Sequence, residues 1–313
     1  MNATATTLTL TNDLLTGMEW APAQVRELFH LAADIKARPD RYRGALEGKF
    51  LAMIFEKPSL RTRVTFEVGI ASLGGTSVFL DHTATRLGAR ESIRDTAKNL
   101  ERMVHGIIAR VFSQESLDGL AAHCRIPVIN ALSDRFHPCQ ALSDFFTLEE
   151  RFGGLRGLKF AYVGDGNNVC HSLVAIAARV GAHIRVATPA GYEPDAAVVA
   201  EAKRVARETR GKIEIIRSAE DAVAGAQAVY TDVWASMGQE EESAAREVAF
   251  AGYQVNEPLF SQAASDAVFL HCLPAHRGSE VADGVIDSER SIVFDQSENR
   301  LHVQKAILLT LLN

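Results

Sequence analysis

Two arginines, a serine and a threonine lie close together in the run Ser59-Leu60-Arg61-Thr62-Arg63. Guanidinium and hydroxyl groups donate hydrogen bonds to phosphate oxygens. An apolar run at 50–55 precedes these residues and helical spacing at 65–73 follows them, so they lie where a strand passes into a helix. The free N–H groups and positive dipole end of a helix start also attract anions. The stretch predicts a phosphate site, and the alternative is a capped helix with two solvated arginines.

Three more polar side chains lie at the ends of apolar runs in the first half of the chain. Arg110 lies near the end of the run 106–111, and His137 and Gln140 are three residues apart around Pro138, which suits a first helical turn. A neutral histidine can polarise a carbonyl oxygen, and a glutamine amide can accept a hydrogen bond from an NH2 group. Arg110 is therefore predicted to join the phosphate site, and His137 and Gln140 are predicted to face a ligand with a carbonyl oxygen and an NH2 group. The alternatives are a surface arginine and a capped helix start.

The second half opens with an apolar run at 159–163 followed by Gly-Asp-Gly-Asn-Asn at 164–168. This order resembles the start of a dinucleotide-binding unit, but the third glycine is missing and the signature is incomplete. A later apolar run ends in Asp232 and leads to Ser236 and Met237. The loop therefore offers an acidic group, a hydroxyl and a thioether to a ligand.

The last apolar run, 267–270, leads into His271 and Cys272, with His276 four residues further on. A free cysteine at a strand end is usually a small buried hydrophobic residue. Zinc bound by these three side chains is an alternative, but adjacent residues cannot easily coordinate one ion and no fourth ligand is evident. We therefore expect no metal.

Short apolar runs alternate with helical spacings, which predicts parallel strands and an α/β fold. In such sheets ligands bind at the carboxyl ends of the strands, where the polar residues above lie. A Gly-rich break at 153–157 favours a boundary between two domains. Segment 13–37 predicts one or two helices joined near Pro22, and an apolar helix from about Arg300 to Leu312 closes the chain. The predicted strands are 50–55, 76–80, 106–111, 127–131, 159–163, 183–188, 212–216, 228–232 and 267–270. Further helices are predicted at 65–73, at 91–104, at 195–209 and after residue 172 through Val180.

With 313 residues, 47% hydrophobic and 23% charged, the chain is long enough for two domains with ordinary cores. Its net charge of −6 offers no basic surface, so no nucleic-acid partner is expected. No apolar run approaches the roughly 18 residues that span a bilayer, and the Thr-rich N-terminus lacks a signal core, so neither membrane insertion nor export is expected. The four cysteines lack paired spacing, which predicts reduced thiols in a cytoplasmic protein.

Taken in order, these motifs resemble those of the aspartate and ornithine carbamoyltransferase family. The run 59–63 is similar to its carbamoyl-phosphate motif, and His137-Pro138-Cys139-Gln140 is similar to the turn that contacts the carbamoyl group. The loop 232–238 and the run His271-Cys272-Leu273-Pro274 are similar to the ornithine branch. The resemblance covers nearly the whole chain.

The resemblance implies two doubly wound parallel-sheet domains with the active site between them. Residues 1–150 would bind carbamoyl phosphate, a Rossmann-like domain at 151–296 would bind L-ornithine, and a C-terminal helix at 297–313 would pack back on the first domain. The carbamoyl phosphate site would consist of Ser59, Leu60, Arg61, Thr62, Arg86, Arg110, His137, Gln140, Cys272, Leu273 and Arg300, and the ornithine site of Asn168, Asp232, Ser236 and Met237. Of these, Cys272, Arg110 and His137 would be catalytic, with no cofactor.

The implied reaction transfers the carbamoyl group to the δ-amino group of L-ornithine, giving L-citrulline and phosphate. It would serve arginine biosynthesis or, in reverse, arginine degradation. The amine must lose its proton although a free alkylammonium titrates at about pH 10, and either Cys272 or the leaving phosphate could accept that proton. The alternatives are another amine such as N-acetylornithine, N-succinylornithine or putrescine, a noncatalytic metabolite-binding protein, or a dinucleotide-dependent oxidoreductase. The intact loop 232–238 favours free ornithine.

Two positions depart from the family pattern. Leu60 stands where the family commonly has threonine, at a position that contributes mainly its backbone. Arg86 stands where the family often has glutamine or histidine, in a loop at 85–90 that reaches a neighbouring subunit's site. The resemblance therefore implies a homotrimer, or a multiple of trimers, with shared active sites.

Overall fold

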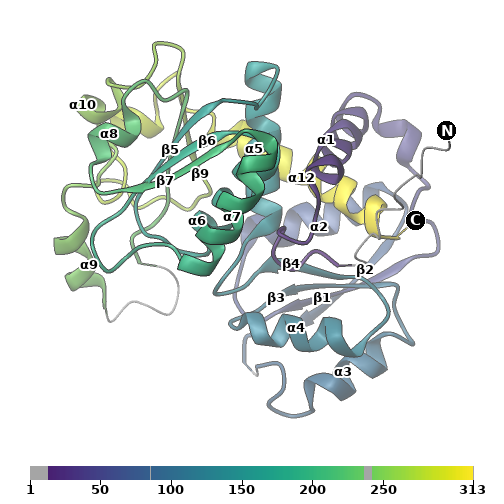
Figure 1. The fold of residues 1–313 in the computed structure, drawn as a ribbon. Helices are drawn as coiled ribbons and strands as arrows, with labels where there is room; N and C mark the ends of the chain where they lie inside the picture. The colour runs from purple at the N-terminus through teal and green to yellow at the C-terminus, as the bar shows by residue number, and fades with distance from the viewer. Residues whose placement is uncertain (1–12, 85, 236–241, 313) are drawn as a thin grey trace, which may run out of the picture.

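The computed structural model describes residues 13–84, 86–235 and 242–312. Two parallel β-sheets, each flanked by helices, form two lobes (Figure 1). The first sheet has the strand order β2-β1-β3-β4, with β1 at Phe50–Phe55, β2 at Thr76–Asp81, β3 at Gly106–Arg110 and β4 at Val128–Leu132. The second has the order β7-β6-β5-β8-β9, with β5 at Lys159–Val163, β6 at His183–Ala187, β7 at Lys212–Ile216, β8 at Ala228–Thr231 and β9 at Val268–His271. The predicted α/β fold with two parallel sheets is confirmed.

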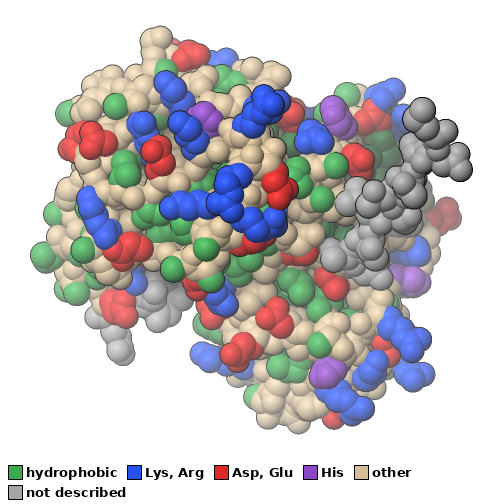
Figure 2. Space-filling view, viewed as in Figure 1, with side chains coloured by type: hydrophobic (Ala, Val, Ile, Leu, Met, Phe, Trp, Pro, Cys, Tyr) green, Lys and Arg blue, Asp and Glu red, His purple; other side chains and the backbone are tan. Residues whose placement is uncertain are grey.

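Helices connect the parallel strands. Those of the first half are α1 (Pro22–Ala37), the 3-10 helix η1 (Pro39–Tyr42), α2 (Leu60–Ser72), α3 (Ile93–Leu100), α4 (Gln114–His123) and α5 (Pro138–Phe152). Those of the second half are α6 (Asn168–Val180), α7 (Ala196–Thr209), α8 (Ala219–Val223), α9 (Ser243–Phe250), α10 (Glu257–Phe260), α11 (Asp283–Ile286) and α12 (Val293–Leu312). No helix in the described part of the chain is both long and apolar enough to cross a membrane. On the face shown in Figure 2, acidic and basic side chains are interspersed.

Strand order determines where a ligand can bind. In the first sheet, β2 pairs with one edge of β1 and β3 pairs with the other, so the chain reverses its direction across the sheet at β1. In the second sheet, β6 and β8 lie on the two sides of β5 in the same way. Open α/β sheets bind ligands beyond the carboxyl ends of the strands at such reversals. Strands β1, β3, β5, β8 and β9 are almost fully buried, as the near-continuous apolar runs of a covered parallel sheet require.

The C-terminal helix α12 returns to the first lobe and packs against α1, α2 and α5 (Figure 1). Its side chains Val303, Ala306 and Ile307 are buried in the same core as Phe29 and Phe146. The helix begins at Val293, earlier than the predicted boundary at 297, so Arg300 lies within it rather than at its start.

Two helix predictions were too long. In segment 13–37 only α1 is helical: Leu14 forms a parallel bridge with Ile129, donating from its N–H to the Val128 carbonyl and accepting from the Asn130 N–H. Gly17, at a φ of 79°, turns the chain between this bridge and the helix. The predicted helix 91–104 covers only Ile93–Leu100. Apolar spacing did not indicate that Leu14 extends the sheet.

Candidate active site

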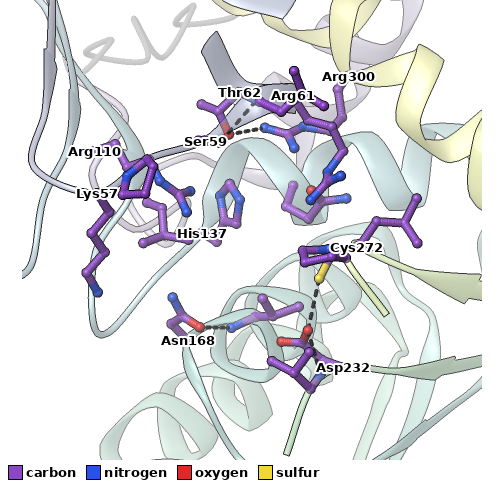
Figure 3. A pocket seen from close by; sticks show the side chains of 18 of the residues that line it. Lys57, Ser59, Arg61, Thr62, Arg110, His137, Asn168, Asp232, Cys272 and Arg300 are labelled. Atoms are coloured by element: carbon purple, nitrogen blue, oxygen red, sulfur yellow. Dashed lines mark hydrogen bonds between the residues drawn. The ribbon is translucent and has the colours of Figure 1, made fainter. Parts of the chain in front are cut away.

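A cavity of about 370 Å³ lies between the carboxyl ends of the two sheets (Figure 3). Residues predicted for the site that line it are Ser59, Leu60, Arg61, Thr62, Arg110, His137, Gln140, Asn168, Asp232, Cys272, Leu273 and Arg300. The predicted site did not include Lys57 and Val233, which also line the cavity. His276, considered from the sequence only as a zinc ligand, lines it as well. Ser236 and Met237 lie outside the described residues, although the neighbouring Ala235 lines the cavity.

The first turn of α2 forms one wall. Ser59 is the N-cap of this helix and accepts a hydrogen bond from the Thr62 N–H at 3.3 Å. The Thr62 hydroxyl in turn accepts from Arg300 Nη2 at 2.7 Å, which ties α12 to this turn. The side chain of Leu60 is 75% exposed, so this position contributes mainly backbone to the wall.

Three arginines surround this turn without an acidic partner. Arg110 ends β3 and Arg300 projects from α12, and both are buried, while Arg61 is half-buried (Figure 3). None of the three lies within 4.0 Å of a carboxylate of the described chain. Burial, and then the charge of Arg300, lower the pKa of Arg110 to about 10. Uncompensated buried cations are costly, so this wall favours an anionic ligand.

His137 and Gln140 begin α5 beside these arginines. Burial, followed by the charges of Arg300 and Arg110, holds the pKa of His137 well below its usual value, so the imidazole is neutral at neutral pH. The His137 N–H donates to the Ser172 hydroxyl at 2.8 Å, which joins α5 to α6 of the second lobe. His137 Nδ1 and Gln140 Oε1 are both buried and have no hydrogen-bond partner in the part of the chain that the structure describes.

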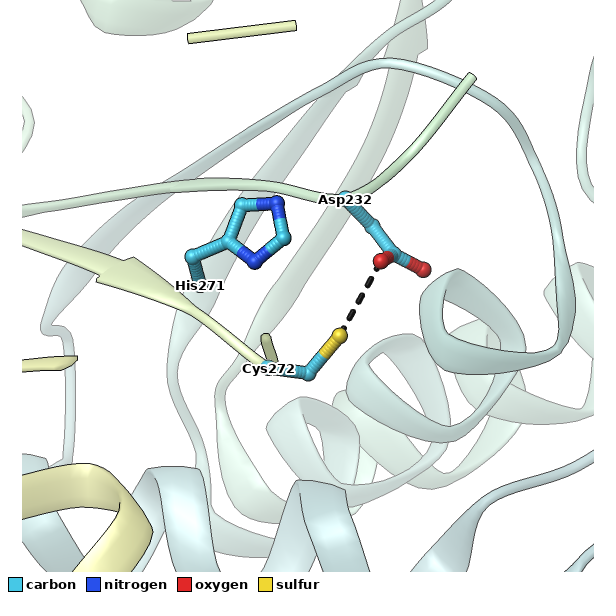
Figure 4. A group of neighbouring side chains, drawn as sticks. All are labelled: Asp232, His271 and Cys272. Carbon is cyan, nitrogen blue, oxygen red and sulfur yellow. Dashed lines mark hydrogen bonds between the residues drawn. The ribbon is translucent and has the colours of Figure 1, made fainter. Parts of the chain in front are cut away.

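An acid and a thiol form the opposite wall. Asp232, directly after β8, accepts a hydrogen bond from Cys272 Sγ at 3.0 Å (Figure 4). It also accepts from Asn167 Nδ2 at 2.8 Å and from the Val233 N–H at 2.8 Å. Burial, and next the Asp232 charge, raise the pKa of the Cys272 thiol well above its usual value. Without a ligand, Cys272 is therefore a protonated donor rather than a base. Asn168 reaches toward the first lobe and donates to the Ser133 carbonyl at 2.6 Å.

Asp232, Cys272 and His271 bring potential metal-ligand atoms within 4.8 Å of one another (Figure 4). His276, the third ligand of the zinc alternative, is not part of this group. Both ring nitrogens of His271 already have contacts: Nδ1 accepts from the Leu273 N–H at 2.9 Å, and Nε2 lies 3.2 Å from Glu280 Oε1. The imidazole therefore fixes the turn after β9.

Arg86 does not line the cavity of its own chain, although it lies over the same aromatic ring as Lys57, which does. Its guanidinium group stacks over the ring of Phe112 at 4.3 Å, and Lys57 Nζ lies 4.5 Å from the centre of the same ring. The side chain of Arg86 is exposed, and it is not among the residues that line the cavity.

A buried carboxyl group supports the cavity from behind. Asp144 on α5 accepts hydrogen bonds from Gln140 Nε2 and Gln296 Nε2, and burial raises its pKa to about 7. A carboxyl group whose pKa is higher in the folded state stabilises the fold most below its unfolded pKa, near 3.8, and loses that contribution as pH rises through about 7.

The D144N variant should therefore gain stability relative to the wild type as pH rises from 5 to 8, on the order of 2 to 3 kcal/mol. Asparagine keeps an oxygen for both glutamines but does not ionise. Chemical denaturation at fixed chain concentration measures the difference. The exposed Asp266→Asn change is the control, and equal pH dependence of D144N and wild type would contradict the expectation.

Two family models match the chain. Residues 12–150 match "Aspartate/ornithine carbamoyltransferase, carbamoyl-P binding domain" and residues 156–311 match "Aspartate/ornithine carbamoyltransferase, Asp/Orn binding domain". An ornithine carbamoyltransferase of Anoxybacillus flavithermus is 51% identical over 315 residues, covering 100% of both chains. The structure of ornithine carbamoyltransferase from Pyrococcus furiosus has a TM-score of 0.91 at 48% identity and covers 95% of each chain. A structure of acetylornithine transcarbamylase with acetylcitrulline has a TM-score of 0.88 at 31% identity, covering 97% of this chain and 100% of that one. The chain belongs to the aspartate/ornithine carbamoyltransferase family.

Proposed function

We propose that this protein transfers the carbamoyl group of carbamoyl phosphate to the δ-amino group of L-ornithine, giving L-citrulline and phosphate. The observation that carries the proposal is one cavity with two contrasting walls: three arginines that have no acidic partner among the described residues on one, and the Asp232–Cys272 pair on the other. One wall suits a phosphate and the other suits an amine. The reaction serves arginine metabolism, and the four free cysteines support a reducing, cytoplasmic setting.

Carbamoyl phosphate binds at the first wall. Its phosphate receives hydrogen bonds from Arg61, Arg110 and Arg300 and from the Ser59–Thr62 turn, where α2 begins. Neutral His137 donates to the carbonyl oxygen, and the unpartnered Gln140 Oε1 accepts from the NH2 group. As the amine attacks, negative charge grows on the carbonyl oxygen and then leaves with the phosphate, and the arginines stabilise both.

Ornithine binds at the second wall. Asp232 and Cys272 contact its δ-amine, and Asn168, with Ser236 and Met237, holds the α-amino acid end. The nitrogen lone pair forms the new N–C bond, the C–O bond to phosphate breaks, and the amine gives up one proton. Because the Cys272 thiol is protonated without ligand, it can accept that proton only after its own proton has left. The departing phosphate, which carries free oxygens, is a competing acceptor.

Product analysis tests the proposal. Purified protein is incubated with carbamoyl phosphate and, separately, ornithine, N-acetylornithine, putrescine or aspartate, and ureido products are identified by mass. Citrulline from ornithine alone is the expected result. Turnover of another amine would support the assigned carbamoyl phosphate site but would show that ornithine is not the acceptor. No turnover with any amine would support a binding role.

We further propose a homotrimer in which neighbouring copies share active sites. An exposed apolar stripe runs along α2 through Leu60, Val64 and Val68, and Val78 on the edge strand β2 is also exposed. The stripe begins at Leu60, on the rim of the cavity, and the exposed Arg86 follows β2. Contact between two different surfaces of the chain closes into a ring, which brings a neighbour's Arg86 to each cavity.

The Val64→Glu change should disrupt this assembly and reduce activity with it, because a carboxylate would be buried in an apolar contact. Light scattering should give three times the chain mass, or a multiple of it, for the wild type and a lower mass for the variant. Val248→Glu, at a valine 80% exposed on α9, is the matched control. A monomeric wild type with full activity would contradict shared sites.

A further inference from the structure

We infer that Asp144 is a positioning residue that holds the Gln140 amide with its carbonyl oxygen facing the substrate, so that the site distinguishes a carbamoyl NH2 group from a methyl group. The inference rests on the proposed function. It concerns a residue that does not touch the substrate and does not line the cavity.

Asp144 lies one helical turn after Gln140 on α5 and is fully buried. One of its oxygens, Oδ1, accepts two hydrogen bonds: from Gln140 Nε2 at 2.8 Å and from Gln296 Nε2 at 2.7 Å. Gln140 and Gln296 are each 1% exposed, so water does not compete for these groups. Three buried polar side chains, those of Gln140, Asp144 and Gln296, are therefore linked by a chain of hydrogen bonds between α5 and α12.

A backbone group fixes the direction of this chain. The His271 N–H can only donate, and it donates to Gln296 Oε1 at 3.0 Å. Gln296 must then present its NH2 group to Asp144, whose Oδ1 acts as the acceptor. The ionised Asp144 carboxylate can only accept, so Gln140 presents its own NH2 group to the same oxygen. The amide assignment therefore follows from an unambiguous donor, and not from the similar shapes of nitrogen and oxygen.

The consequence appears at the cavity. Gln140 lines the cavity, and its Oε1 is turned away from Asp144 and buried with no partner among residues 13–84, 86–235 and 242–312. A carbamoyl NH2 group donates and a methyl group does not, so this oxygen is satisfied by carbamoyl phosphate and left unpaired by acetyl phosphate. If the Gln140 amide turned over, its own NH2 group would face the NH2 group of carbamoyl phosphate. Two donors would then meet, and the site would no longer distinguish a carbamoyl group from an acetyl group. His271 immediately precedes Cys272, so the same chain of hydrogen bonds connects the second wall to Gln140.

The experiment compares equilibrium binding of carbamoyl phosphate and acetyl phosphate to the wild type and to D144L, D144A and D144N. We expect D144L to lower the preference for carbamoyl phosphate by about tenfold or more, because the acceptor that orients Gln140 is gone. D144A, in which water can fill the space of the carboxyl group, should behave likewise if D144L folds poorly. D144N keeps an acceptor oxygen at the same place, so it should prefer carbamoyl phosphate over acetyl phosphate as the wild type does.

The affinity for acetyl phosphate should change little in all variants, which separates lost orientation from general damage. In a Q140L background, D144L should cause no further loss of preference. Full preference in D144L and D144A, or an equal loss in D144N, would overturn the positioning role. Citrulline formation by the wild type is measured alongside: its absence would reject the proposed function, whereas its presence with an unaltered preference in D144L would reject the role of Asp144 alone.

Discussion

Replacing Arg61 with alanine is expected to lower kcat/KM for citrulline formation by about a thousandfold or more, with little loss of folding stability. Arg61 lines the cavity and is half-buried, and it has no carboxylate partner among the described residues. Its charge contributes to lowering the pKa of Arg110. Its removal therefore relieves repulsion in the free protein, while the phosphate that leaves in the transition state loses a bidentate donor.

Steady-state kinetics and a thermal melt of the same preparation check this expectation, together with the Kd for inorganic phosphate, which should rise. Arg204→Ala is the matched control, because Arg204 is an exposed arginine on α7 whose partners, Glu201 and Glu208, lie on the same helix. Near-normal turnover by the Arg61→Ala variant would mean that the phosphate wall has been assigned wrongly. A large fall in melting temperature would mean that Arg61 supports the fold instead.

The sequence was most informative where strands end. Fully apolar runs that alternate with helices require a parallel sheet, and parallel order brings all the carboxyl ends of the strands to one edge. Arg110 and Asp232 could therefore be placed from the strands that precede them, and His137 and Gln140 from Pro138 at the helix start. Each of these signals is local, which is why the nine predicted strands are all present.

Contacts between distant segments could not be predicted in this way. Gln296 is 152 residues from Asp144, and nothing in the spacing of either residue indicates that they meet. The pairing of Leu14 with Ile129 and the stacking of Lys57 and Arg86 on Phe112 are of the same kind. Arg300 was expected at the site from its place at the start of the last predicted helix and through the family resemblance, although that helix begins earlier, at Val293. Tertiary packing decides these contacts.

The Asp232→Asn change tests the opposite wall, and we expect it to lower kcat/KM for ornithine by about a hundredfold or more while leaving carbamoyl phosphate binding unchanged. Asp232 accepts from Cys272, Asn167 and Val233. An asparagine must point its NH2 group at one of these donors. Asn167 cannot turn over to accommodate it, because its own oxygen caps α6 by accepting from the Val169 and Cys170 N–H groups. The variant also lacks the negative charge that attracts a cationic amine.

A second readout distinguishes lost charge from lost structure. Since the charge of Asp232 and its hydrogen bond both raise the pKa of the Cys272 thiol, the variant should have a lower thiol pKa, and alkylation of Cys272 should begin at lower pH than in the wild type. Asp266→Asn, at an exposed residue near the opposite end of β9, is the control for removal of a carboxylate. If carbamoyl phosphate affinity fell together with the use of ornithine, the two walls would not be independent. If the thiol pKa stayed unchanged while ornithine use fell, Asp232 would act on the amine without controlling Cys272, and the leaving phosphate would be the better candidate for proton acceptor.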